Sequence, residues 1–347
     1  MSPITKVKDT KSSLITRLFK PMGKSWESDL RTLEMDPRGE LVVGVSNSHT
    51  MFLGSLVTGA LVVPNEPTLT AFHEEMGFLS WHATTLAFGL DTLVVRSGNE
   101  LQVWSWSRGK LTLTNRSKWE TGKKGPIPLA NFEGSLHCTS AEIASLVGLA
   151  QKPRGNDSVN WKDRVIAVWQ RAKLPVAKSL DGNARETRPT RQLALEKEYG
   201  DVCFALAEDG TATIAESLEY QKTAMTRWNV AGKRVARAVL DVSVTDLALA
   251  GSHVVVTGGD GELLSLDETL AEVKRVKAHR DRAVSVRASN DGGFVVTTSS
   301  KELSVFDTAS LKRVATLAVK GLHDFRAQSV SERLVLTNNP PRLFALS

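Results

Sequence analysis

The sequence is poor in residues and segments that mark several common classes of protein. It has 347 residues but only two cysteines, Cys138 and Cys203. Two are too few for a disulfide framework, and this scarcity is typical of a reducing compartment. No apolar stretch approaches the roughly 18 residues that a membrane-spanning helix needs. We therefore expect an intracellular protein, cytoplasmic or nuclear, with no membrane span.

Motifs that mark enzymes and metal sites are also missing. Residues 23–25 (Gly-Lys-Ser) match the end of a phosphate-binding loop, but Leu18 stands where that loop requires its first glycine. His137, Cys138 and Cys203 do not have the spacing of zinc ligands. No serine lies in the motif of a nucleophile elbow. We therefore predict that the protein is not an enzyme and binds no cofactor or metal.

The charge of the chain leaves the partner and the compartment open. Residues 1–24 are basic, carry several hydroxyl side chains and lack the continuous apolar core of a secretory signal. A mitochondrial presequence is therefore an alternative to a cytoplasmic or nuclear location. The net charge of the whole chain is +6, which permits anionic partners without requiring them.

The most informative feature that is present is an internal repeat. Residues 254–267 align with residues 294–307 without a gap, at an offset of 40 residues. Each copy consists of an apolar run, a small polar turn and a second alternating run that ends in Asp267 or Asp307. A repeat of about 40 residues with several strands is typical of a β-propeller blade. Because one blade cannot bury its own faces, further blades must stack beside it and close a ring.

The rest of the chain divides into further blades, which gives seven in total within a range of six to eight. We predict the third strand of each blade near Leu53, Trp104, Trp169, Trp228, Leu266, Phe306 and Phe344. Residues 60–63 are expected as the fourth strand of the first blade, and residues 174–178 as the returning strand of the third. The fourth blade is expected to begin at residues 192–195. Residues 217–223 are an insertion or an additional hairpin.

The last blade has only three strands, so its outer edge needs a cover. The apolar run at 14–19 has no other assignment. We therefore predict that residues 13–19 form the outer strand of the last blade and close the ring, with residues 1–12 as a disordered basic arm. In the rival interpretation, residues 1–24 are a disordered arm or a targeting segment. The closed ring makes residues 1–347 a single all-β domain.

Two segments resemble the WD-repeat family. Residues 226–235 (Thr-Arg-Trp-Asn-Val-Ala-Gly-Lys-Arg-Val) resemble the family's Trp-Asp, turn and Gly-Lys ending. Residues 277–286, followed by Asp291-Gly292 and Phe306-Asp307, resemble a whole blade. The resemblance covers roughly residues 226–317 and implies a divergent, WD-like propeller.

The same resemblance implies structural roles for individual residues. The family has a network of His, Ser/Thr, Asp and Trp, in which His279 stands for the loop histidine and Phe306 for the tryptophan. Thr298 fits the hydroxyl position, whereas Ser300 replaces the turn Asp. The preceding blade keeps this Asp as Asp260. We therefore expect His279, Asp260 and Asp307 to be structural.

Basic residues gather in the connections between predicted blades, which emerge on one face of a propeller. The candidate partner-binding residues are Arg116, Lys118, Trp119, Lys123, Lys124, Lys274, Arg275, Lys277, Arg280 and Arg282. Trp81 and Trp119 are the candidates for exposed contact anchors. Combined on one face, the basic residues would attract acidic protein segments or phosphate backbones. In the alternative interpretation, the basic residues do not combine and are only solvated charges of surface loops.

These features predict a rigid, non-enzymatic scaffold that binds other proteins of a larger complex through its propeller loops. Two alternatives remain open. The basic loops could bind RNA or a ribonucleoprotein. In addition, residues 270–279 look similar to a blade of the propeller exchange factors that activate the small GTPase of vesicle-coat assembly.

Overall fold

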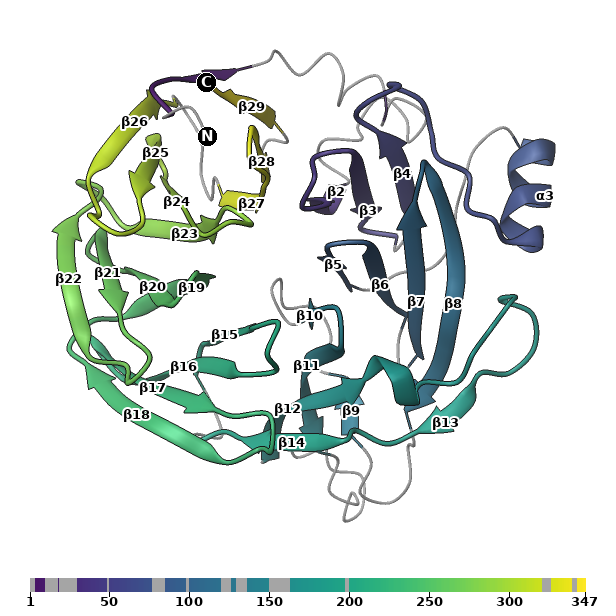
Figure 1. The fold of residues 1–347 in the computed structure, drawn as a ribbon, viewed down its shortest axis with the longest axis horizontal. Coiled ribbons are helices and arrows are strands. Elements are labelled where there is room, and N and C mark those ends of the chain that lie inside the picture. Colours follow the sequence, from purple (N-terminus) through teal and green to yellow (C-terminus); the bar gives the residue numbers. More distant parts are fainter. Residues whose placement is uncertain are drawn as a thin grey trace.

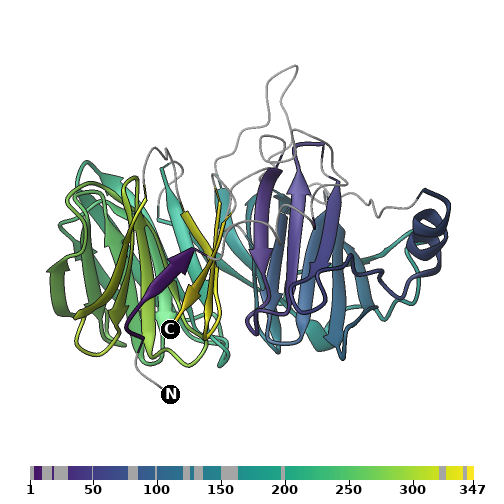
Figure 2. The ribbon, with the colours of Figure 1, turned by 90° about the horizontal axis from the view of Figure 1, so that it is seen from above.

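The computed structural model describes residues 4–9, 18, 30–48, 50–76, 85–97, 100–119, 126–128, 136–149, 163–196, 200–319, 326–338 and 342–347. These residues form seven β-sheets arranged as blades around a central axis (Figure 1). Seen edge-on in Figure 2, the strands run between the two faces of the ring. The predicted all-β, seven-bladed propeller is therefore confirmed.

Blades four, five and six are four-stranded antiparallel meanders in chain order from the axis outward. Blade four consists of β15 (Val202–Leu206), β16 (Ala212–Glu219), β17 (Lys222–Trp228) and β18 (Arg234–Leu240). Blade five consists of β19 (Val244–Ala250), β20 (His253–Gly258), β21 (Glu262–Leu266) and β22 (Glu272–Lys277). Blade six consists of β23 (Ala283–Ala288), β24 (Phe294–Ser299), β25 (Glu302–Asp307) and β26 (Arg313–Ala318). Residues 217–223 are neither an insertion nor an extra hairpin, because they belong to the β16–β17 hairpin itself.

Blades two and three are joined by a segment that crosses between them. Blade two contains β5 (Thr85–Gly89), β6 (Thr92–Ser97), β7 (Glu100–Ser107), β8 (Lys110–Trp119) and, parallel to β8, β13 (Arg185–Thr187). Blade three contains β10 (Leu136–Cys138), β11 (Glu142–Leu149), β12 (Asp163–Gln170) and β14 (Arg191–Ala194), with β9 (Pro126–Pro128) also paired to β11. A 3-10 helix, η2 (Arg171–Lys173), begins the crossing segment. The segment therefore leaves blade three, lies on blade two and returns.

This crossing overturns two expectations. Residues 174–178 lie beside β8 of blade two, where Arg116 N–H donates to Pro175 O (3.1 Å), instead of forming the outer strand of blade three. The outer strand of blade three is β14, so this segment does not begin blade four. Both runs are short and alternating, and their sequence pattern does not specify which blade each one pairs with. The buried carboxylate of Glu66 holds the crossing segment beside blade two, because it accepts Leu180 N–H (3.0 Å).

Blade one consists of β2 (Leu30–Met35), β3 (Leu41–Ser46) and β4 (Met51–Ser55). Its predicted fourth strand, residues 60–63, is reduced to a single bridge between Leu61 and Gly54. The chain then forms α3 (Pro67–Met76), which was not predicted from the sequence and which projects from the perimeter in Figure 1. Glu66 Oε2 caps the helix by accepting Leu69 N–H (2.9 Å).

Blade seven is closed by an N-terminal strand, but not by the predicted one. Its strands are β27 (Arg326–Val330), β28 (Leu334–Asn338), β29 (Arg342–Leu346) and β1 (Val7–Asp9). β1 pairs antiparallel to β29 with Val7 opposite Leu346, and Thr5 and Lys6 N–H donate to Ser347 O at 2.8 and 2.7 Å. The closing strand therefore lies within residues 1–12, which were assigned to a disordered arm, and not at residues 13–19.

The apolar pattern explains this error. β1 contains a single apolar residue and gives almost no strand pattern, whereas residues 14–19 give a strong one. Of residues 13–19, Leu18 lies within the described part of the chain, and it is buried between blades one and seven against Phe52 and Leu343. Gly54 leaves space for it, since a Cβ there would lie 2.8 Å from Leu18 Cδ2. Leu18 is therefore a core residue, the edge of β29 is covered by β1, and the rest of residues 13–19 lies outside the described part of the chain.

The core is divided among the blade interfaces. The described residues form seven apolar clusters, one between each pair of neighbouring blades. Central strands such as β3 and β24 are buried along their whole length because both faces pack on a neighbouring blade. All seven predicted third-strand positions lie on the third strand of a blade. Ring closure is reinforced between blades one and seven, where Met35 N–H donates to Ser329 Oγ (3.0 Å).

Candidate interaction site

The site lies on blades five and six, where the internal repeat occurs. In each blade, the aspartate that ends the third strand forms the turn into the outer strand. Asp267 Oδ1 accepts Thr269 N–H (2.8 Å) and Ala271 N–H (3.0 Å), and Asp307 Oδ1 accepts Ser310 N–H (2.8 Å). Hydrogen bonds from the Thr269 and Ser310 side chains hold the pKa of the two carboxyl groups below its usual value. The repeated aspartates therefore fix where β22 and β26 begin.

The connection from blade five to blade six, residues 278–282, is packed directly on the β20–β21 turn. Ala278 and His279 N–H both donate to Gly261 O at 2.9 Å. Gly261 has φ +79°, and a Cβ at this position would lie 2.2 Å from Asp281 O. Only glycine fits such a conformation at such a short distance. The connection is thus held by its backbone on both sides of Arg280.

His279 fastens the same connection to blade six. Its Nδ1 lies 2.8 Å from Glu302 Oε1, and its Nε2 lies 2.7 Å from Thr297 Oγ1. A carboxylate, an imidazole and a hydroxyl in this order also form the catalytic relay of serine hydrolases. Here the Thr297 side chain is 0% exposed and His279 is 2% exposed, so a substrate has no access to the hydroxyl. We define these three residues as the His279 clasp, a structural element.

The predicted partner of His279 was one residue away. The hydroxyl beside His279 belongs to Thr297, whereas that of Thr298 lies 2.7 Å from Ser285 Oγ, on the other face of the sheet. Adjacent residues of a strand point to opposite faces, so an error of one residue changes the blade interface that a side chain reaches. Glu302 was not assigned a role, although its identity with Glu262 in the internal repeat was an available indication.

The clasp gives a prediction for pH dependence. Burial lowers the pKa of His279 below its usual 6.5, although the hydrogen bond with Glu302 opposes the shift; Arg313 lowers it further and Asp281 raises it. Below pH 6.5 the unfolded chain therefore binds a proton that the folded chain does not, and the folded state loses stability as the pH falls. We expect the free energy of unfolding to decrease more in the wild type than in His279→Gln between pH 7.5 and 5.5, as measured by urea denaturation. An equal decrease in both proteins would contradict this.

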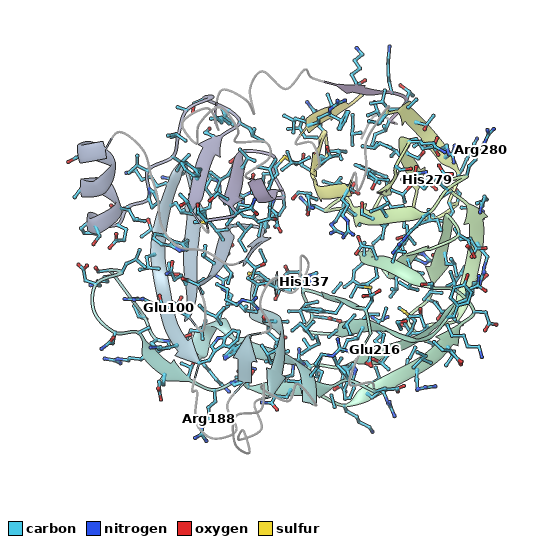
Figure 3. All side chains as sticks on the ribbon, turned by 180° about the vertical axis from the view of Figure 1, so that it is seen from behind. Glu100, His137, Arg188, Glu216, His279 and Arg280 are labelled. Carbon is cyan, nitrogen blue, oxygen red and sulfur yellow. The ribbon has the colours of Figure 1, made fainter. Side chains whose placement is uncertain are left out.

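Two of the predicted basic residues, Arg116 and Arg275, form ion pairs with glutamates of the same blade. Arg116 forms two hydrogen bonds with Glu100 (2.7 and 3.1 Å), labelled in Figure 3, and a third with Leu180 O (2.6 Å). Arg275 forms ion pairs with Glu272 (2.6 Å) and Glu262 (3.2 Å). These two arginines are therefore committed to holding neighbouring strands. Lys118 lies half-buried on β8, opposite β13.

The predicted exposed anchor, Trp119, is a core residue. It is 0% exposed and stacks on Trp169, with ring centroids 4.8 Å apart and an interplanar angle of 19°. The last residue of β8 alternates onto the face that packs against blade three, which a position next to a basic connection did not indicate. Trp81, Lys123 and Lys124 lie outside the described residues.

Four of the predicted basic residues form no ion pair with the rest of the described chain. They form a strip from the outer strand of blade five into the following connection, and we name Lys274, Lys277, Arg280 and Arg282 the basic strip. All four are exposed, and none has an ion-pair partner within the described residues. Lys277 Nζ donates to the carbonyl of Asp260, which is exposed in the β20–β21 turn. Figure 3 shows Arg280 at the perimeter of the ring, with His279 inside it.

The described residues show neither a metal site nor a membrane-spanning helix. They contain no cluster of three or more His, Cys, Asp or Glu side chains that could hold a metal ion. No helix among them has the length and apolar character that crossing a membrane requires. No family model matches the chain, and no curated protein matches it. The fold is a seven-bladed β-propeller. On this propeller, the four exposed cations of the basic strip lie on β22 and in the connection that follows it.

Proposed function

We propose that the protein is a non-enzymatic scaffold that binds an acidic surface of a partner protein, within a larger complex, through the basic strip. The observation that carries this proposal is the set of four exposed cations that have no carboxylate within ion-pair distance among the described residues, in a chain that pairs Arg116, Arg275 and Arg191 with glutamates. Unneutralised like charges repel one another and do not stabilise the fold, so their grouping indicates a role in binding.

The rigidity of the strip supports the same function. The His279 clasp, the Gly261 contacts and the ion pair of Asp281 with Lys301 (2.7 Å) hold the connection in one position. Binding by a surface that is already ordered loses little conformational entropy, which favours affinity. Proteins built on a propeller fold commonly mediate protein–protein interaction.

We also propose that the chain is a divergent member of the WD-repeat family. The His279 clasp joins a loop histidine to a hydroxyl on the second strand of the blade, although this hydroxyl belongs to Thr297 and not to Thr298, the residue that the sequence resemblance implied. Glu302 takes the carboxylate position from the third strand, and Phe306 replaces the tryptophan. An intracellular location, cytoplasmic or nuclear, and a mitochondrial one all remain predictions.

The alternatives have less support. Single-stranded nucleic acids usually stack on aromatic side chains beside the basic residues, and Trp119, the aromatic in the predicted basic set, is buried against Trp169. No feature of the described residues favours nucleotide exchange on a GTPase. Acidic protein segments require only positive charge and a fixed backbone, and both are present.

Affinity isolation with a matched variant tests the proposal. The tagged wild type and Arg280→Glu/Arg282→Glu are each used to isolate partners at moderate salt, with and without nuclease, and the bound proteins are identified. We expect the same protein partner to survive nuclease treatment and to be lost with the double variant, because reversing two charges turns attraction into repulsion. Lys233→Glu, on an exposed turn of blade four, is the control and should retain the partner. Release of all bound material by nuclease would establish RNA binding instead, and equal binding by the double variant would remove the basic strip from the function.

A further inference from the structure

The outer strand of blade five has a bare edge. β22 pairs with β21 on one side, and no described strand pairs with its other side. Alternate N–H and C=O groups of such a strand point outward and can bond to another chain. Five of its six residues are exposed, and Val273 is 58% exposed. The edge thus combines free backbone groups with an apolar side chain and the two lysines of the basic strip that lie on β22.

The chain covers two of its other outer edges with its own segments. β1 pairs with the edge of β29, and β13 pairs with the edge of β8. In the second case the added strand is parallel, and Glu186 lies opposite Lys118. An outer strand of this propeller therefore accepts an additional strand from a segment distant in sequence, with an acidic residue opposite a basic one.

β22 differs in charge from the other bare edges of blades four to six. On β18, Arg234 and Arg237 both form ion pairs with Glu196, at 2.7 and 2.8 Å. On β26, Arg313 donates to Ala278 O and lies 3.8 Å from Glu302. On β22, Lys274 and Lys277 have no carboxylate within ion-pair distance among the described residues. Of these three edges, β22 is therefore the one prepared for an acidic strand.

We propose that an acidic, extended segment of the partner protein binds to β22 as a fifth strand of blade five. This inference rests on the proposed function and specifies how the partner binds. Backbone hydrogen bonds to the edge supply affinity, and alternate side chains supply specificity. Lys274 and Lys277 lie on opposite faces of β22, so the segment has acidic residues on both of its faces and an apolar residue beside Val273.

The test uses a short acetylated peptide, Glu-Val-Glu-Glu-Val-Glu, and the full chain. Two further peptides of the same sequence and charge are N-methylated at alternate amides, one in each phase, so that one of them loses the donors facing β22. We expect that peptide to bind at least about tenfold more weakly than the parent, because several hydrogen bonds of about 1 kcal/mol each are lost. Hydrogen exchange should show that the parent peptide protects amides of β22 and not those of β18 or β26.

Charge variants supply the second arm. Lys274→Glu and Lys277→Glu should each weaken binding about five- to tenfold, whereas Lys233→Glu should leave the affinity unchanged. Thermal unfolding of each variant shows whether the fold is retained. Equal binding by all three peptides, protection outside β22, or no binding would overturn strand addition. If the partner isolated above still depends on Arg280 and Arg282 in that case, the scaffold function stands and only its mode of binding changes.

Discussion

Deletion of residues 1–9 is expected to reduce the free energy of unfolding by about 5 kcal/mol. The deletion removes β1 and exposes the edge of β29. Val7 is buried in the cluster between blades six and seven, where an aliphatic side chain contributes about 2 kcal/mol. The backbone hydrogen bonds around Ser347 and β29 contribute about 1 kcal/mol each. For a chain of 347 residues, the loss lowers the melting temperature by about 7 °C, measurable by calorimetry.

Two variants separate closure of the ring from a general effect of the N-terminus. Val7→Asp keeps the chain length and should be nearly as destabilising as the deletion, because it buries a carboxyl group among apolar side chains. Lys8→Ala alters an exposed side chain of the same strand and should have little effect. A deletion variant with an unchanged melting temperature would show that β1 does not hold the ring closed.

Substitution of Trp119 by alanine is expected to have an effect of similar size. The indole is completely buried between blades two and three, and removing a buried tryptophan costs about 3–5 kcal/mol because a cavity remains. Loss of the stack on Trp169 adds about 1 kcal/mol. Urea denaturation should show a clearly lower midpoint with a similar dependence on urea.

The matched control is Tyr220→Ala, because Tyr220 is 89% exposed on the β16–β17 turn. Its removal should change the free energy of unfolding by no more than about 0.5 kcal/mol. If Trp119→Ala were equally neutral, the residue would be a surface side chain after all, and its role as a partner anchor would have to be considered again.

The propeller was predictable because its evidence is periodic. The aligned copies at 254–267 and 294–307 specify one blade, and strands such as β20 and β24 have the apolar composition that burial on both faces requires. The third strands could be located for the same reason, since each has a large apolar residue near its end. The length of the repeat and the apolar pattern of the strands therefore allow the blades and their third strands to be located in the sequence.

Pairing between distant segments could not be predicted in this way. The closing strand β1 has one apolar residue, and β13 follows a polar segment, so neither has a pattern of its own. Both are positioned by tertiary contacts: β1 by β29, and the segment before β13 by the buried Glu66 carboxylate. The basic residues show the same limit, because Arg116 and Arg275 form ion pairs with Glu100 and Glu272, whereas Lys274 is exposed and forms no ion pair with a described residue. The sequence shows where charged residues occur, but only the fold shows which opposite charge each of them contacts.

The pairing of β1 with β29 also constrains the order of events during biosynthesis. Thr5 and Ser347, which are hydrogen-bonded in the closed ring, are 342 positions apart in the sequence. The edge that β1 covers does not exist until β29 has left the ribosome. β1 is translated long before β29, but it cannot pair until β29 has been made. Contacts of such wide separation are slow to form, and partly assembled arcs of blades meanwhile expose apolar faces. Completion of the circle is therefore the natural late step in maturation, and the stage at which a chaperone would be of most use.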